Sequence, residues 1–174
     1  MSCIVAIEEN GTVYMGAETA ATSEDGSRRP IMCDKMVVNG SYVFGFTGSV
    51  RAGQVLRPHT FTPPSEFNLI GEAIRVLFNE MQLTTEGEVG AQCATNLIIG
   101  YDGHIYEMLM DFQVNQSLYD FTTVGSGAPY AFGALYSCMD MGLTPEERIT
   151  LALDAAIEFD SSCKYPTIIR NFSW

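Results

Sequence analysis

Ser2 is the residue of this 174-residue sequence that is best placed for nucleophilic chemistry. It lies directly before the apolar run Cys3–Ile7, which is typical of a strand, and a strand that begins a chain holds its first residue in a fixed geometry. After removal of Met1, Ser2 would carry both a hydroxyl and a free α-amine, whose intrinsic pKa of about 7.7–8.0 suits it to act as a general base toward that hydroxyl. Taken alone, the pattern favours the simpler interpretation that Ser2 is an ordinary second residue.

A lysine and a glutamate could act on such an amine. The chain has only two lysines, and one of them, Lys35, opens the apolar run Met36–Val38. Glu18 ends the second strand of the first predicted hairpin and could reach the same end of the sheet. A lysine–carboxylate pair beside a free amine would keep that amine neutral through like-charge repulsion, which a general base requires. By itself, the pair is better explained as a solvated salt bridge at a sheet edge.

Other residues give weaker indications of a site. Neither histidine, His59 nor His104, lies in a motif that is typical of an activated serine or cysteine. The triplet Gly125–Gly127 is not a phosphate-binding loop, because no Gly-Lys-Ser/Thr sequence follows it, and it indicates a tight turn from a strand to a helix. The five cysteines are scattered and form no Cys-x-x-Cys pair, so we expect reduced thiols in the core rather than disulfides or a zinc site.

Composition and charge exclude several classes of protein. Nine basic and 21 acidic side chains give a formal net charge of -12, which argues against binding to nucleic acids or to anionic membranes. Apolar residues make up 47% of the chain and charged residues 17%, so the chain is not disordered. No apolar run approaches the roughly 20 residues of a membrane span, and the N-terminus lacks the basic region of a signal peptide. We expect a soluble, intracellular protein with a single domain over residues 1–174.

Three dipeptides predict β-hairpins, because Asn-Gly and Asp-Gly adopt the positive φ angles of type I′ turns. They are Asn10–Gly11, Asn39–Gly40 and Asp102–Gly103, and β-branched or aromatic runs flank each of them. Much of the chain is therefore predicted to be antiparallel sheet, with a last strand at Thr167–Phe172. The segments Ala20–Arg29 and Arg57–Pro64 are predicted to be surface loops.

Apolar residues at helical spacing predict helices that would cover these strands. The best-marked helix follows Thr144, which forms a capping box with Glu147. Other helices are expected from Pro129 to about Met139 and, as a short segment, after Ser49. A further helix opens at Pro63–Ser65. The apolar stripe of the helix after Thr144 consists of Ile149, Ala152, Leu153, Ala156, Ile157 and Phe159. The apolar stripe of the helix that opens at Pro63–Ser65 consists of Ile70, Ile74, Leu77, Phe78 and Met81. Two stacked antiparallel sheets flanked by helices would bury these faces.

Four N-terminal motifs resemble a known family. Ser2–Ile7, followed by a Gly turn, is similar to a family opening of two threonines and an apolar strand. Met15–Glu18 corresponds to a Gly/Ala-rich strand end with an acidic residue, and Asp34–Met36 to the position of the catalytic lysine. Phe44–Ser49 is like the Gly-rich strand end whose backbone N–H forms the oxyanion hole. The family is that of the proteasome β-subunits and bacterial HslV, which are N-terminal nucleophile hydrolases.

The C-terminal third strengthens this resemblance, which covers nearly the whole chain. Val124–Ala131 resembles the family's Gly-Ser-Gly turn that runs into a helix. Leu143–Glu147, Leu151–Ala156 and Phe159–Asp160 resemble the helix that ends at the active-site aspartate. The resemblance implies an α+β fold, namely a four-layer α/β/β/α sandwich of two antiparallel sheets. It also implies assembly into a homo-oligomeric ring, hexameric or heptameric, and in some members stacked.

Carried over residue by residue, the resemblance implies a serine variant of a threonine-type endopeptidase. Ser2 would attack a peptide carbonyl while its own amine takes the proton. Lys35 would tune that amine, and Glu18 would orient Lys35. The N–H of Gly48 would stabilise the oxyanion, where one such donor is typically worth about 3 kcal/mol.

Further roles and departures follow from the same resemblance. Ser126 and Asp160 would hold the amine and the path of the proton. Cys163 stands where proteasomes have a serine near the amine. Ser2 replaces the family's threonine, which loses a methyl group but keeps the hydroxyl, and Glu18 replaces an aspartate and is one methylene longer.

The resemblance implies polypeptide substrates, an ATP-dependent unfoldase as partner, a cytoplasmic location and no cofactor. A cation held by backbone carbonyls near Ser162 and Tyr165 is compatible with it, although the sequence does not identify a metal. One alternative is a catalytically silent ring that retains Met1 and serves as a structural or scaffolding protein, for example in a phage particle, in which case its location is the virion. A weaker alternative is an amidase that applies the same chemistry to a small amide.

Overall fold

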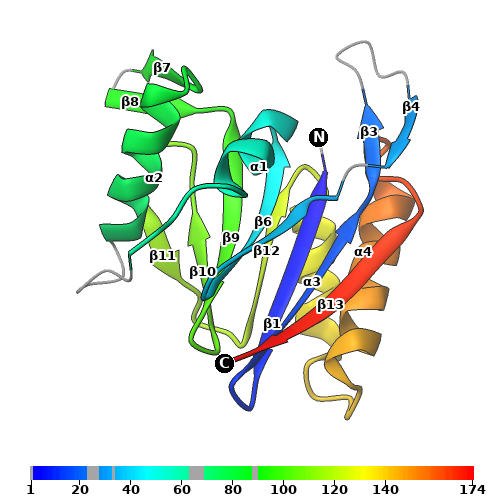
Figure 1. The fold of residues 1–174 in the computed structure, drawn as a ribbon. Coiled ribbons are helices and arrows are strands. Elements are labelled where there is room, and N and C mark those ends of the chain that lie inside the picture. The colour runs from blue at the N-terminus through cyan, green and yellow to red at the C-terminus, as the bar shows by residue number, and fades with distance from the viewer. Residues whose placement is uncertain (1, 23–27, 33, 63–68, 88–89) are drawn as a thin grey trace.

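Two antiparallel sheets lie face to face and form the middle of the molecule (Figure 1). The computed structural model describes residues 2–22, 28–32, 34–62, 69–87 and 90–174. The first sheet has the order β12-β1-β2-β13, formed by Phe121–Gly125, Cys3–Glu9, Thr12–Glu18 and Thr167–Ser173. The second sheet has the order β11-β10-β9-β6-β5, formed by Val114–Gln116, His104–Met108, Thr95–Tyr101, Tyr42–Gly48 and Met36–Asn39.

Helices cover the outer face of each sheet (Figure 1). Helices α1 (Val50–Leu56) and α2 (Leu69–Glu80) pack on the second sheet, and α3 (Ala128–Cys138) and α4 (Pro145–Phe159) pack on the first. The predicted four-layer α/β/β/α sandwich is thus confirmed. Pro63–Ser65, where the sequence predicts that the helix corresponding to α2 opens, lies outside the described residues. In the described part of the chain, no helix is long and apolar enough to span a membrane.

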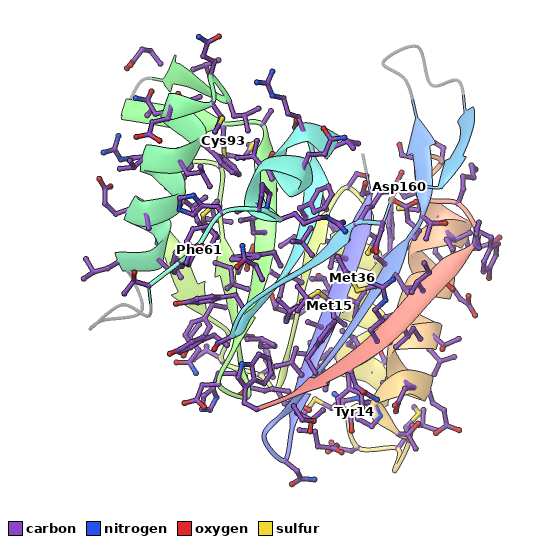
Figure 2. All side chains as sticks on the ribbon, viewed as in Figure 1. Tyr14, Met15, Met36, Phe61, Cys93 and Asp160 are labelled. Atoms are coloured by element: carbon purple, nitrogen blue, oxygen red, sulfur yellow. The ribbon has the colours of Figure 1, made fainter. Side chains whose placement is uncertain are left out.

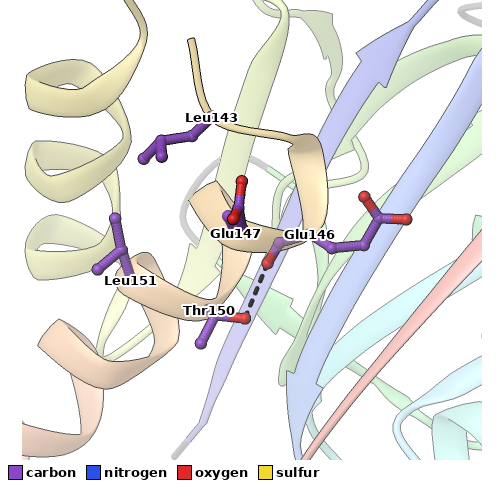
Figure 3. A pocket seen from close by; sticks show the side chains of 5 residues that line it. All are labelled: Leu143, Glu146, Glu147, Thr150 and Leu151. Carbon is purple, nitrogen blue, oxygen red and sulfur yellow. Dashed lines mark hydrogen bonds between the residues drawn. The ribbon is translucent and has the colours of Figure 1, made fainter. Parts of the chain in front are cut away.

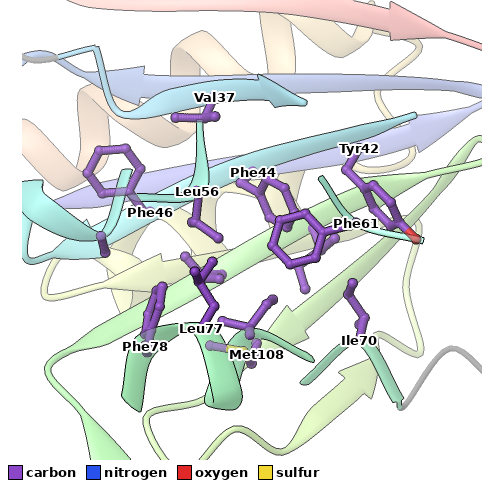
Figure 4. Packing of buried hydrophobic residues seen from close by; sticks show 14 of the residues in the cluster. Val37, Tyr42, Phe44, Phe46, Leu56, Phe61, Ile70, Leu77, Phe78 and Met108 are labelled. Carbon is purple, nitrogen blue, oxygen red and sulfur yellow. The ribbon is translucent and has the colours of Figure 1, made fainter. Parts of the chain in front are cut away.

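Three clusters of buried apolar side chains hold the layers together. Phe44 and Phe78 belong to the cluster between the second sheet and helices α1 and α2 (Figure 4). Met15 and Met36 belong to the cluster between the two sheets, where Figure 2 labels them. Leu153 belongs to the cluster between the first sheet and helices α3 and α4. Burial of this apolar surface is the main stabilising contribution to the fold.

Two of the three predicted hairpin turns form as expected. Asn10 and Gly11 have φ angles of 51° and 74°, and Asp102 and Gly103 have φ angles of 50° and 79°, as type I′ turns require. The third turn is displaced by one residue, because Asn39 pairs with Tyr42 and so belongs to β5. Gly40, with φ of 58°, supplies the positive φ angle at the first central position of that turn.

Two short hairpins depart from the predicted loops and strands. Strands β3 (Ala20–Thr22) and β4 (Arg28–Met32) pair within and beyond the predicted loop 20–29, so that prediction was wrong for the described residues there. Strands β7 (Thr84–Gly87) and β8 (Gly90–Cys93) were not predicted. The β7 and β8 segments are short and lack apolar alternation, so only their pairing shows them as strands. Residues 57–62 form no helix or strand, as expected for a loop.

Helix α4 begins as predicted but ends differently. The Thr144 hydroxyl accepts a hydrogen bond from the Glu147 N–H at 3.3 Å, and the Glu147 carboxylate accepts one from the Thr144 N–H at 2.8 Å, so the capping box is confirmed. Phe159 was expected in the buried stripe but is 67% exposed, because it is the last helical residue and its ring packs on Tyr130 at the surface instead. Met81 is likewise exposed, because it follows the end of α2.

The close approach of the two sheets can be tested at a glycine. A Cβ at Gly45 would lie 2.6 Å from Ile4 Cγ2 and 2.6 Å from Met15 Sδ, which are buried between the sheets. We expect Gly45→Ala to lower the free energy of unfolding by about 1–3 kcal/mol through overpacking. The matched control is Gly133→Ala in α3, where nothing lies within 4 Å and helix propensity predicts a gain of about 0.5–1 kcal/mol. Denaturant titration of both variants measures the effect, and equal effects would contradict the packing argument.

Candidate active site

Ser2 is held at the end of the first sheet by its own carbonyl group. Cys3, the first residue of β1, pairs with Gly125 at the end of β12. The carbonyl oxygen of Ser2 accepts hydrogen bonds from the N–H of Gly127 at 3.3 Å and from the hydroxyl of Ser126 at 3.4 Å. Ser2 itself is only 4% exposed. The predicted strand-to-helix turn therefore fixes the backbone of Ser2.

The side chain of Lys35 joins Ser2 to Glu18. Lys35 Nζ donates a hydrogen bond to Ser2 Oγ at 2.9 Å, and it also pairs with Glu18 Oε1. The side chain of Lys35 is 5% exposed and that of Glu18 is fully buried. The pair is therefore not the solvated salt bridge at a sheet edge that the sequence pattern alone favoured. Burial of a charge costs solvation free energy, and proteins tolerate this cost when the charge is paired and hydrogen-bonded, as it is here.

Neighbouring strands position Lys35, which precedes β5. Its carbonyl oxygen accepts a hydrogen bond from the N–H of Phe46 at 3.0 Å. The carboxylate of Asp34 accepts one from the N–H of Met36 at 3.1 Å and one from Arg170 on β13 at 3.0 Å. Because β13 pairs with β2, which carries Glu18, these contacts tie both members of the ion pair to one framework.

Gly48 ends β6 next to Ser2, and both residues line a pocket of about 190 Å³. Its φ angle is 85°, and a Cβ at this position would lie 2.0 Å from the carbonyl oxygen of Ala94. No other residue type fits this backbone. The described lining also includes Thr47, Asn96 and Met110, which no sequence motif marks. Thr47 on β6 pairs with Asn96 on β9, and Met110 follows β10 and accepts a hydrogen bond from the N–H of Cys93, so only the folded chain brings them together.

Asp160 lies beyond the end of α4 and joins the same network (Figure 2). Burial acts to raise the pKa of its carboxyl group, but hydrogen bonds from Ser126 and Ser162 outweigh burial and lower the pKa below the usual 3.8. The N–H of Ser162 donates to Asp160 Oδ1 at 2.8 Å. Ser126 therefore contacts both the Ser2 carbonyl and Asp160.

Cys163 lies behind the turn rather than among the described residues that line the Ser2 pocket. Its N–H donates to the carbonyl oxygen of Asp160 at 3.0 Å, and its thiol packs against Gly127. Burial raises the pKa of this thiol to about 12, and burial likewise raises the pKa of Cys3. Both thiols are therefore protonated at neutral pH and are not nucleophiles. They are free, as the sequence predicts for core cysteines.

A larger pocket of about 400 Å³ lies at the start of α4 (Figure 3). Leu143, Leu151 and the first acidic residues of the helix line it, and the Thr150 hydroxyl donates to the Glu146 carbonyl oxygen at 2.8 Å. It lies at the opposite end of α4 from Asp160, roughly 20 Å along the helix axis. Among its described residues there is no pair of nucleophile and base, so its size does not make it the candidate site.

Among the described residues, no group of three or more His, Cys, Asp or Glu side chains is arranged to hold a metal ion. A cation bound by backbone carbonyls near Ser162 and Tyr165 stays a prediction, since such a site needs no side-chain ligands.

These features coincide with a known protein family. Residues 2–165 match the family model described as proteasome subunit, and the chain therefore belongs to the proteasome subunit family. A search of curated protein sequences gave no match.

Solved structures share the fold. BPH from Thiobacillus denitrificans, in complex with epoxomicin, is 18% identical with a TM-score of 0.80, over 98% of each chain. HslV from Trypanosoma brucei is 18% identical with a TM-score of 0.71, over 99% of each chain. An Anbu variant from Hyphomicrobium sp. strain MC1 is 16% identical with a TM-score of 0.70, over 99% of this chain and 82% of the other. At these identities the likeness concerns the fold alone.

The lowered pKa of Asp160 predicts how the stability of the fold depends on pH. Because the folded-state pKa lies below 3.8, ionised Asp160 stabilises the fold above that pH, and this contribution is lost as the pH falls through the lowered value. We expect Asp160→Asn to lower the Tm near pH 6 and the difference from the wild type to shrink below about pH 4. Calorimetry across this range measures it. Asp140→Asn, at an exposed aspartate, controls for the loss of one charge, and an equal, pH-independent effect of both variants would contradict the assignment.

Proposed function

We propose that this chain is an N-terminal nucleophile endopeptidase, a subunit of a proteasome-like or HslV-like ring in which Ser2 cleaves peptide bonds after Met1 has been removed. The observation that carries this proposal is the buried hydrogen bond of 2.9 Å from Lys35 Nζ to Ser2 Oγ, with Glu18 as the counter-ion of Lys35. A serine in an unrelated structural role does not require a buried lysine at its hydroxyl, because an uncharged donor would satisfy it at less cost.

The α-amine of Ser2 is the proposed general base. Ser2 is small, so an aminopeptidase is expected to remove Met1. The freed amine takes the proton of Ser2 Oγ as this oxygen attacks the carbonyl carbon of the substrate. The ammonium of Lys35 disfavours a second positive charge nearby, so the amine stays neutral and able to accept a proton. The same proton is then delivered to the leaving amine of the substrate, and water later hydrolyses the ester of Ser2.

The turn residues would serve this reaction in two ways. The N–H of Gly48, beside Ser2 in the pocket, is the proposed donor to the oxyanion. Ser126 and Asp160 are proposed to orient the α-amine, and their contacts near Ser2 support this role. Cys163 would act only through the backbone, because its thiol is buried and protonated.

Assembly would enclose the site. Membership of the proteasome subunit family supports a homo-oligomeric ring with polypeptide substrates, for which an ATP-dependent unfoldase would be the partner. A cytoplasmic location fits this role. The alternative is a catalytically silent ring in a virion, whose subunits retain Met1. It differs from the proposed peptidase in the peptide bond between Met1 and Ser2, and the first experiment therefore examines that bond.

Mass spectrometry and an active-site probe test the proposal together. The intact mass should show the loss of one methionine, and a peptide epoxyketone should add to Ser2, because its ketone and epoxide can react with the hydroxyl and the amine of one residue. Epoxomicin is bound in the BPH structure that shares this fold, which makes it a suitable probe. Ser2→Ala should abolish the adduct, and Ser2→Thr should retain it. A chain that keeps Met1, or one that lacks it and still forms no adduct, would leave only the silent ring.

The role of Lys35 has its own test. Removal of Lys35 alone would leave the buried Glu18 carboxylate without its lysine counter-ion, at a cost of about 3–5 kcal/mol, so the double variant Lys35→Met/Glu18→Gln is preferable. We expect the rate of epoxyketone labelling to fall by up to about 10²–10⁴-fold, the usual contribution of a general base, because the α-amine would lose the charge that keeps it neutral. Lys164→Met removes the only other lysine, which is exposed, and should label at the wild-type rate. Unchanged labelling of a folded double variant would exclude Lys35 from the mechanism.

A further inference from the structure

A second pocket adjoins the pocket of Ser2. It has a volume of about 340 Å³, which lies within the range of about 300–1,000 Å³ typical of ligand sites. The two pockets share Asn96 and Gly125 as walls, so they form neighbouring parts of one depression. Gly125 belongs to β12, the edge strand of the first sheet, and the depression therefore opens at an edge that no further strand covers in the described structure.

Glu107 is the only charged side chain among the described residues that line the two pockets. Side chains alternate along a strand, so Glu107 on β10 shares its face with Ile105, which is buried between the sheets. A glutamate at such an inward-facing position is unusual, since carboxylates are rarely buried without a partner. The other walls include Pro129 and Phe132, which are apolar.

The surroundings of Glu107 leave its charge poorly compensated. Burial raises the pKa of its carboxyl group, and a hydrogen bond from Thr122 offsets burial only in part. A hydroxyl donor does not neutralise a carboxylate, whereas a cation that enters the pocket would pair with it and offset the cost of its burial. The overall net charge of -12 also favours the approach of cationic segments.

We infer that this second pocket accepts a lysine or arginine side chain of the polypeptide substrate and that Glu107 determines this specificity. The inference rests on the proposed peptidase function, because the pocket matters only if Ser2 cleaves the bound chain. The apolar walls would contact the methylene groups of the side chain, and the carboxylate would bind its charged end. Glu107 would then bind substrate without taking part in proton transfer at Ser2.

The test uses the processed protein and pairs of peptides. Digestion of a defined mixture of unfolded proteins, followed by mass spectrometry, identifies cleaved bonds. Peptides around one such bond are then made with lysine or with its uncharged analogue norleucine at each position next to the bond. At one position, the wild type should cleave the lysine peptide with a kcat/KM about tenfold higher than that of the norleucine peptide, mainly through a lower KM. A factor of this size is the scale of one charge-assisted contact. Glu107→Gln should abolish this ratio while cleaving the norleucine peptide normally.

Glu146→Gln is the matched control, because it removes one negative charge from an exposed glutamate in α4 and should keep the tenfold preference. Equal cleavage of the lysine and norleucine peptides at every position by the wild type would overturn the inference and leave the proposed peptidase intact. Loss of the preference in both Glu107→Gln and Glu146→Gln would also overturn it, since the cause would be net charge. If no protein is cleaved and no epoxyketone adduct forms, the proposed function fails, and the inference fails with it.

Discussion

The buried ammonium of Lys35 is the constraint on which the arrangement of this end of the molecule depends. It lies where water is almost excluded, and it contacts Glu18 and Ser2 Oγ. Glu18 comes from β2 in the first sheet, Lys35 precedes β5 in the second sheet, and Ser2 precedes β1. A single charge thus joins the two sheets at the point where the chain begins. Displacement of either sheet would leave a charge buried without its partner, which costs more than the loss of an ordinary contact.

The sheets can approach closely enough for this contact because a glycine of the second sheet faces large apolar side chains of the first. Gly45 accommodates Ile4 and Met15, and Gly125 accommodates the carbonyl group of Ser2. The same principle shapes the pocket, where Gly48 adopts a positive φ angle against Ala94. Packing between the layers and the geometry of the candidate site therefore have one common requirement, which is the absence of Cβ atoms at a few positions.

Much of this fold could be predicted because its signals are local. The Asn10–Gly11 turn, the capping box of Thr144 and the strands rich in β-branched and aromatic residues are each encoded within a few residues. The polar β7–β8 hairpin carries no such signal, and neither do the pocket residues Asn96 and Glu107, since their positions depend on which strands become neighbours. The contact between Ser2 and Lys35 was anticipated through family resemblance, whereas the residues taken alone favoured an ordinary serine and a solvated ion pair. Ser2 and Lys35 are 33 residues apart in the chain, so a local sequence pattern could not predict their contact.

Two of the departures from the family pattern, Ser2 and Glu18, are compatible with one another in this geometry. A serine at position 2 lacks the methyl group that restricts χ1 of a threonine, so its hydroxyl needs orientation from outside. The hydrogen bond from Lys35 supplies that orientation, and the almost complete burial of Ser2 limits other rotamers. Glu18 is longer than an aspartate by one methylene, yet it still reaches Lys35 from a fully buried position at the end of β2. Both replacements keep the same donors and acceptors and change only how each is held, so neither departure by itself removes the chemistry proposed for the site.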